Sequence, residues 1–127
     1  MPRIKHVIFV SQSHLAHNVI EILSKTLTKR VDLTCFTTLN DLAESAALHP
    51  VNLVILDHNT FAAAGSEHTI SLLLGTRSLK HTYKILLHKR DDVFDSQLLQ
   101  SLGFVSFLTK PFLPEELTEL MQKCLKG

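Results

Sequence analysis

Apolar residues gather along the chain in short, unbroken runs that end abruptly in polar residues. Such runs lie at residues 6–10, 51–57, 83–87 and 104–108. Runs of this length, rich in Val, Ile and Leu, predict strands that are buried on both faces of a sheet. Residues 31–36 instead alternate apolar with polar side chains, which predicts a half-exposed strand near a sheet edge. The pattern therefore predicts five strands.

The segments between these strands carry apolar residues at helical spacing. Ser13 is a candidate N-cap for the first helix, which is marked by the apolar residues Leu15, Val19, Ile22, Leu23 and Leu27. Four further helices are expected over 39–46, 66–74, 94–102 and 114–124. The segment between the third strand and Ser66, with Gly65, is expected to be a loop.

Strict alternation of five strands with five helices predicts a parallel sheet with helices on both faces, joined by right-handed crossovers. The expected architecture is a flavodoxin-like, doubly wound α/β fold with strand order 2-1-3-4-5. Residues 1–127 contain no internal repeat, low-complexity segment or linker, so a single domain is expected.

Composition narrows the possible functions. A chain with 45% hydrophobic and 20% charged residues is typical of a globular protein. The net charge of +1 favours neither nucleic acid nor an acidic membrane as a partner. No apolar run is long enough for a membrane span or a signal peptide, so we expect a cytoplasmic protein. Cys35 and Cys124 have no metal-binding or redox spacing and are expected to be reduced core residues.

Candidate chemistry lies at the carboxyl ends of three strands. Ser11 and Gln12 follow the first strand, Asp57 ends the third, and Lys110 follows the fifth, directly before Pro111. In an open parallel sheet, ligands bind at this edge, beside the point where the strand order reverses. The long side chain of Lys110 can reach the crevice that holds Asp57.

With these residues in this order, the whole chain resembles the receiver domain of bacterial response regulators, the family of the chemotaxis regulator. The resemblance rests on Asp57, on Gly65 eight residues later, and on the Lys110-Pro111-Phe112 ending with Phe107 three residues before the lysine. It implies that a histidine kinase transfers a phosphoryl group to Asp57, that Lys110 contacts the phosphoryl oxygens, and that Phe107 rotates inward on activation. It also implies a cis bond before Pro111.

Other positions depart from the family pattern. The acidic pair that largely holds magnesium in the family aligns with Ser11 and Gln12, and the phosphoryl-contacting Ser or Thr aligns with His88. A carboxylate about 4 Å from a unit positive charge attracts it by roughly 4 kcal/mol at an effective dielectric near 20. Losing two carboxylates therefore predicts weak or absent magnesium binding, and Asp57 facing Lys110 as a simple ion pair.

The favoured interpretation is an atypical, or pseudo-, receiver that is not an enzyme, needs no cofactor and acts by binding proteins in a signalling assembly. By resemblance, its surface is the fourth expected helix, the fifth strand and the last helix. The candidate exposed residues there are Gln97, Gln100, Ser101, Glu119 and Lys123. A histidine kinase or a phosphotransfer protein is a candidate partner.

Three alternatives stay open. Asp57 could be phosphorylated despite the lost acidic pair, which would make the chain a working receiver in a phosphorelay. A metal-independent enzyme of flavodoxin-like fold has no GxGxxG, P-loop or GxSxG motif in its favour. Among eight histidines, the group of Asp57, His58 and His88 is the one cluster that could hold zinc, and scattered surface histidines are the simpler interpretation.

Overall fold

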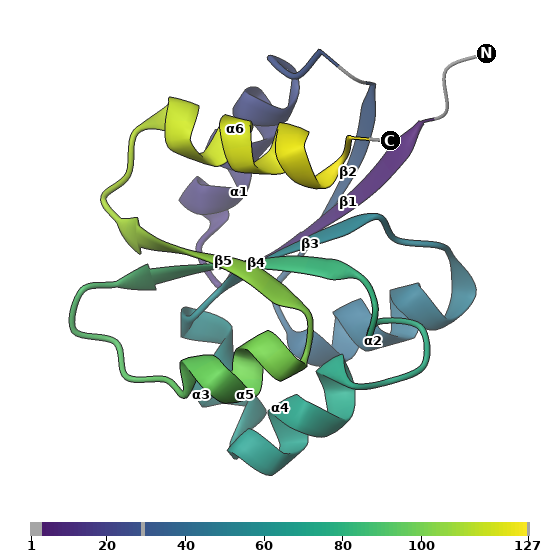
Figure 1. Ribbon diagram of the computed structural model, residues 1–127, viewed down its shortest axis with the longest axis vertical. Coiled ribbons are helices and arrows are strands. Elements are labelled where there is room, and N and C mark those ends of the chain that lie inside the picture. Colours follow the sequence, from purple (N-terminus) through teal and green to yellow (C-terminus); the bar gives the residue numbers. More distant parts are fainter. Residues whose placement is uncertain (1–3, 29, 127) are drawn as a thin grey trace.

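The computed structural model describes residues 4–28 and 30–126 (Figure 1). Its strands are β1 (Lys5–Val10), β2 (Val31–Phe36), β3 (Leu53–Asp57), β4 (Tyr83–Lys89) and β5 (Phe104–Lys110). Its helices are α1 (His14–Ser24), α2 (Leu39–Leu48), α3 (Asn59–Ala64), α4 (Glu67–Leu74), α5 (Ser96–Ser101) and α6 (Pro114–Cys124). The five predicted strands are confirmed, although β3 begins later, and β4 and β5 end two residues later, than predicted.

All strand pairs are parallel and the order is β2-β1-β3-β4-β5, so the predicted doubly wound topology is confirmed. The central strand β3 lies between β1 and β4, and all five of its residues are buried. Because β1 and β3 are neighbours, their carboxyl ends meet, and Val10 pairs with Leu56 one residue before Asp57. The topology thus brings the predicted strand-end residues to one edge.

The sheet separates two apolar layers, and Figure 1 shows α1 and α6 on one face and α2 to α5 on the other. Alternate residues of the buried strands supply the two layers. Val7 and Phe9 pack with Ile20 of α1 and Leu117 of α6, whereas Ile8 and Val10 belong to the opposite cluster. An unbroken apolar run is therefore the expected pattern here, because both faces of each central strand are covered.

A sixth helix, α3, replaces the loop predicted after β3, so the prediction of five helices was wrong. Its sequence contains three consecutive alanines, which favour a helix, but six residues are too few to show helical periodicity. Gly65, at a φ of 98°, ends α3, and Ser66 then caps α4 by accepting a hydrogen bond from Thr69 N. The positive φ suits glycine because it lacks Cβ.

The buried side of α1 differs in part from the predicted apolar residues. Ile20 is buried and Leu23 packs against the core, but Leu15, Val19 and Ile22 are exposed. Both groups have helical spacing, so periodicity identifies the helix without deciding which stripe faces the sheet. Cys35 and Cys124 are free and half-buried, and burial raises the pKa of both thiols.

One lysine, Lys84 near the start of β4, is fully buried. Its ammonium donates hydrogen bonds to the carbonyls of Leu79, Thr82 and Leu102, at 2.5 to 2.9 Å. These three carbonyls use all three donors of the ammonium group. Burial lowers the pKa of Lys84 to about 8. The side chain thereby ties the α4–β4 connection to the end of α5, and Gly103 leaves room for it, since a Cβ there would lie 2.9 Å from Nζ.

Candidate functional site

The candidate site is a buried carboxylate at the carboxyl edge of the sheet. Asp57, the last residue of β3, is 1% exposed. The ammonium of Lys110 donates to both of its oxygens, at 2.8 Å to Oδ1 and 2.7 Å to Oδ2. Ser11, directly after β1, is also buried and its hydroxyl donates to Asp57 Oδ2 at 2.9 Å. The carboxyl ends of β1, β3 and β5 thus each place one side chain in this contact.

Lys110 is the last residue of β5 and not the first residue after it, as the sequence had suggested. The extra length comes from parallel pairing with β4, in which Lys89 lies opposite Lys110. The side chain of Lys110 is 30% exposed, whereas that of Asp57 is 2% exposed, so solvent reaches the pair from the lysine side. The bond between Lys110 and Pro111 is cis, as the resemblance implied.

Asn59 joins the two loops that border Asp57, and sequence reasoning missed it. Its backbone N–H donates to Asp57 Oδ1 at 3.3 Å, and its Nδ2 donates to Ser11 Oγ at 3.3 Å. Its Oδ1 accepts from the backbone N–H of Gln12 at 3.1 Å. An Asn two residues after a strand-ending Asp was the available signal, because both types form local side-chain-to-backbone bonds.

The remaining predicted site residues do not contact the carboxylate. The side chain of Gln12 is exposed, and its hydrogen bond to Asn59 uses the backbone. The ring of His88 lies near the carbonyl of Lys89 at 2.9 Å and the hydroxyl of Thr109 at 3.4 Å. In the described residues, therefore, neither side chain forms a hydrogen bond or an ion pair with Asp57, and the phosphoryl-contact role of His88 stays a prediction.

Phe107 belongs to a row of rings on the α5 side of the sheet. It stacks on Phe104 and on Phe94, with centroids 6.2 Å and 5.6 Å away. His88 packs edge-on against Phe94 at 4.8 Å, and His58 lies 5.8 Å from the same ring. Phe107 is half-buried and packs against the core cluster. Its position fits a core residue, and its role as a switch stays a prediction.

The histidines beside the site are engaged elsewhere. His58 Nδ1 lies 3.4 Å from a carboxylate oxygen of Asp92, and its Nε2 lies 3.2 Å from the carbonyl of Val93. Within residues 4–28 and 30–126, no three His, Cys, Asp or Glu side chains form a group that could hold a metal ion. The zinc cluster considered for Asp57, His58 and His88 is therefore not assembled.

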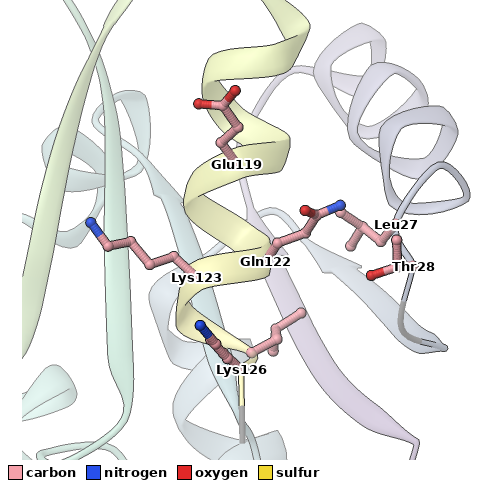
Figure 2. A pocket seen from close by; sticks show the side chains of 7 residues that line it. Leu27, Thr28, Glu119, Gln122, Lys123 and Lys126 are labelled. Carbon is pink, nitrogen blue, oxygen red and sulfur yellow. The ribbon is translucent and has the colours of Figure 1, made fainter.

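One hollow on the surface shares no lining residue with the Asp57 site. Figure 2 shows this hollow, of about 420 Å³, between the end of α6 and the segment after α1, where Gln122 extends towards Leu27 and Thr28. Along the described part of the chain, no helix is both long and apolar enough to cross a membrane.

The site combines a potential nucleophile with one cation and one hydroxyl. A carboxylate can accept a phosphoryl group, a reaction that depends on positioning and on neutralising charge. Here the charge of Asp57 is already neutralised by Lys110, and each of its oxygens accepts two hydrogen bonds. The unmodified site is therefore structurally satisfied as it stands.

Comparison with known proteins identifies relatives of this chain. No protein-family model matches it. Protein PilG of Pseudomonas aeruginosa is 32% identical over 97 residues, which cover 74% of this chain and 70% of PilG. A signal receiver domain from Clostridium thermocellum superposes with a TM-score of 0.79 at 14% identity, and the match covers 97% of this chain and 98% of that one.

Two further solved structures share the fold. The receiver domain of the sensor histidine kinase PA1611 from Pseudomonas aeruginosa, which has a magnesium ion in its active-site cleft, gives a TM-score of 0.74 at 18% identity, covering 98% of this chain and all of that one. The chemotaxis response regulator CheY4 of Vibrio cholerae gives a TM-score of 0.73 at 17% identity, and the match covers 97% of this chain and 100% of that one. Because its sequence matches PilG and its sheet has this strand order, the chain belongs to the receiver-domain family of two-component response regulators.

Proposed function

We propose that this chain is an atypical receiver domain that works through protein–protein contacts, with little or no magnesium-dependent phosphorylation. The observation that carries the proposal is the closed contact of Asp57 with Lys110 and Ser11. A serine hydroxyl stands where the family has an acidic residue, and it donates to Asp57. The carboxylate is therefore stabilised by the protein's own groups in its unmodified form.

The donor set fits magnesium poorly. Mg²⁺ prefers carboxylates and water in near-ideal octahedral geometry. Of the three positions at which the family carries acidic residues, only Asp57 is acidic, since Ser11 and Gln12 occupy the other two. The Lys110 ammonium, 2.7 Å from Asp57 Oδ2, already neutralises the charge of that one carboxylate. A divalent cation bound here would have Asp57 as its one carboxylate, and Ser11 and Gln12 would offer only neutral oxygens.

The proposed docking surface is formed by α5, β5 and α6, which correspond to the fourth helix, fifth strand and last helix expected from the sequence. The five candidate residues on it are all exposed: Gln97, Gln100, Ser101, Glu119 and Lys123. This surface is mostly uncharged on α5, so new charges there change its character while leaving the core intact. Partners of the histidine kinase or phosphotransfer class are the proposed occupants.

Intact mass measurement tests the phosphorylation part of the proposal. The protein is incubated with magnesium and acetyl phosphate, a small phosphoryl donor, beside the Asp57→Asn variant. We expect no added phosphoryl group on either protein. A gain of one phosphoryl group on the unmodified chain that is lost in Asp57→Asn would overturn the proposal and make the chain a working phospho-acceptor.

The docking part of the proposal is tested by measuring which proteins associate with the tagged chain in the cells that produce it. Tagged protein is compared with the double variant Gln97→Lys/Gln100→Lys on α5 and with a control, Asn40→Lys, at an exposed position of α2. We expect the α5 variant to lose a partner that the control and Asp57→Asn both retain. Unchanged association in the α5 variant, with an unchanged melting curve, would refute this surface.

The alternative is a phosphorylatable receiver with Asp57 as acceptor. One observation favours it: Lys110 lies within hydrogen-bonding distance of both carboxylate oxygens, where it could also bind phosphoryl oxygens. The mass measurement separates the two functions, because the alternative requires transfer to Asp57.

A further inference from the structure

A groove between the α3–α4 pair and the start of α5 lies outside the Asp57 contact and borders the docking surface proposed above, with which it shares α5. It encloses about 220 Å³, and its apolar lining includes Phe61, Ile70, Phe94 and Leu98. The break between α3 and α4 opens one side, since a Cβ built on Gly65 would meet no atom within 4 Å. Figure 1 shows these three helices together on one face of the sheet.

The lip of the groove exposes apolar surface. Val93, which lines it from the β4–α5 connection, is 90% exposed, more than any other large apolar side chain in the described residues. An apolar floor beside an exposed apolar lip is typical of a surface that binds an apolar group of a partner.

The polar residues of the rim indicate the charge of that partner. Glu67 on α4 and Asp95 at the start of α5 line the groove from opposite walls, and both are exposed. Glu67 forms no ion pair within the described residues, and Asp95 uses Oδ1 to cap α5 through Leu98 N. The third polar residue, His58, is already 3.4 Å from Asp92. The rim is therefore acidic on two sides.

We propose that this groove binds a short peptide segment of a partner protein in which one bulky apolar side chain is flanked by Lys or Arg. The apolar side chain fills the space above Phe94, and the flanking cations lie against Glu67 and Asp95. Because Phe94 stacks on Phe107, an occupant also contacts the ring row that runs towards β5. This proposal does not depend on phosphorylation of Asp57.

The test is a titration followed by backbone amide NMR. The probe is acetyl-Arg-Ala-Leu-Ala-Arg-amide, and its controls are the same peptide with Glu for both Arg and with Ala for the Leu. We expect saturable shifts at Ala62, Gly65, Val93 and Leu98, reaching Phe107, in the millimolar range for the first peptide. Equal shifts with the acidic peptide, or none with any peptide, would overturn the proposal.

Matched variants locate the site. Ala62→Phe places a ring in the groove and should abolish the shifts, whereas Ala63→Phe, on the same helix but outside the groove lining, should not. Glu67→Lys should weaken binding about threefold or more, a change typical of an exposed ion pair, and Glu44→Lys on α2 should leave it unchanged. Binding that survives Ala62→Phe, or self-association of the free protein that Ala62→Phe abolishes, would overturn a basic peptide as the occupant.

Discussion

Replacing Asp57 by Asn tests whether the site is stabilised by its own groups. Three donors, from Lys110, Ser11 and the backbone of Asn59, converge on the two carboxylate oxygens. Asn keeps the shape of the side chain but offers one oxygen and one N–H₂ group, so a donor then faces donors. The variant also leaves the Lys110 ammonium without its counter-charge.

The expected loss in the free energy of unfolding follows from the geometry and the solvent exposure of the Asp57–Lys110 pair. At 2.7 Å and an effective dielectric near 20, the gross attraction between the two charges is about 6 kcal/mol. Breaking a buried pair by removing one partner costs roughly 3–5 kcal/mol, whereas an exposed pair is worth about 0–1 kcal/mol. Because the Lys110 side chain is 30% exposed and can turn towards water, we expect an intermediate loss of about 2–3 kcal/mol in the free energy of unfolding.

Urea denaturation followed by circular dichroism measures this loss. Asp91→Asn, at an exposed position without ion pairs in the described chain, is the control and should change stability by less than about 0.5 kcal/mol. A double-mutant cycle with Lys110→Met isolates the pair itself. In a receiver with three clustered carboxylates, removing one relieves repulsion, so an Asp57→Asn protein as stable as the original, or more stable, would refute the reasoning.

Two further predictions concern residues that the sequence did not single out. Lys84→Met removes the ammonium donor from three carbonyls, of which that of Leu79 keeps its hydrogen bond from Thr82 N, and should cost roughly 3 kcal/mol, measured by urea denaturation. The pKa of Lys84 is lowered to about 8 in the folded protein, against about 10.4 in the unfolded chain, so between pH 8 and pH 10.4 the unfolded state binds more protons. The stability of the original protein relative to Lys84→Met should therefore rise with pH across this window. A fall would show that the carbonyls keep the ammonium protonated. Asn59→Ala should cost roughly 1 kcal/mol and speed hydrogen exchange at the Gln12 amide, which loses its acceptor; unchanged exchange there would contradict the bridging role.

The strands and the site edge were predictable because they depend on patterns that are local in sequence. The runs ending at Val10 and Asp57 are unbroken because both faces of these strands are covered, and parallel strand order then brings their ends together. The contact between Asp57 and Lys110, which are 53 residues apart, followed from this topology and from the length of the lysine side chain.

The features that the sequence did not reveal depend on which of several neighbouring groups pack or hydrogen-bond together in the folded chain. Helix α3 is too short to show a period, and α1 carries two apolar stripes, of which only the one with Ile20 faces the sheet. His88 aligns with a phosphoryl-contacting residue, yet its ring packs against Phe94. A buried lysine such as Lys84 cannot be recognised from sequence either, since its three acceptors come from the α4–β4 connection and the end of α5.

We propose above that this receiver keeps its fold and its protein-binding surface without a magnesium-dependent switch. The most direct test titrates magnesium with beryllofluoride, a phosphoryl mimic, into the protein and follows backbone amide NMR shifts. We expect no saturable response at low millimolar magnesium. Shifts that cluster at Ser11, Asp57 and Lys110 and spread to Phe107 would contradict it and show that the switch survives.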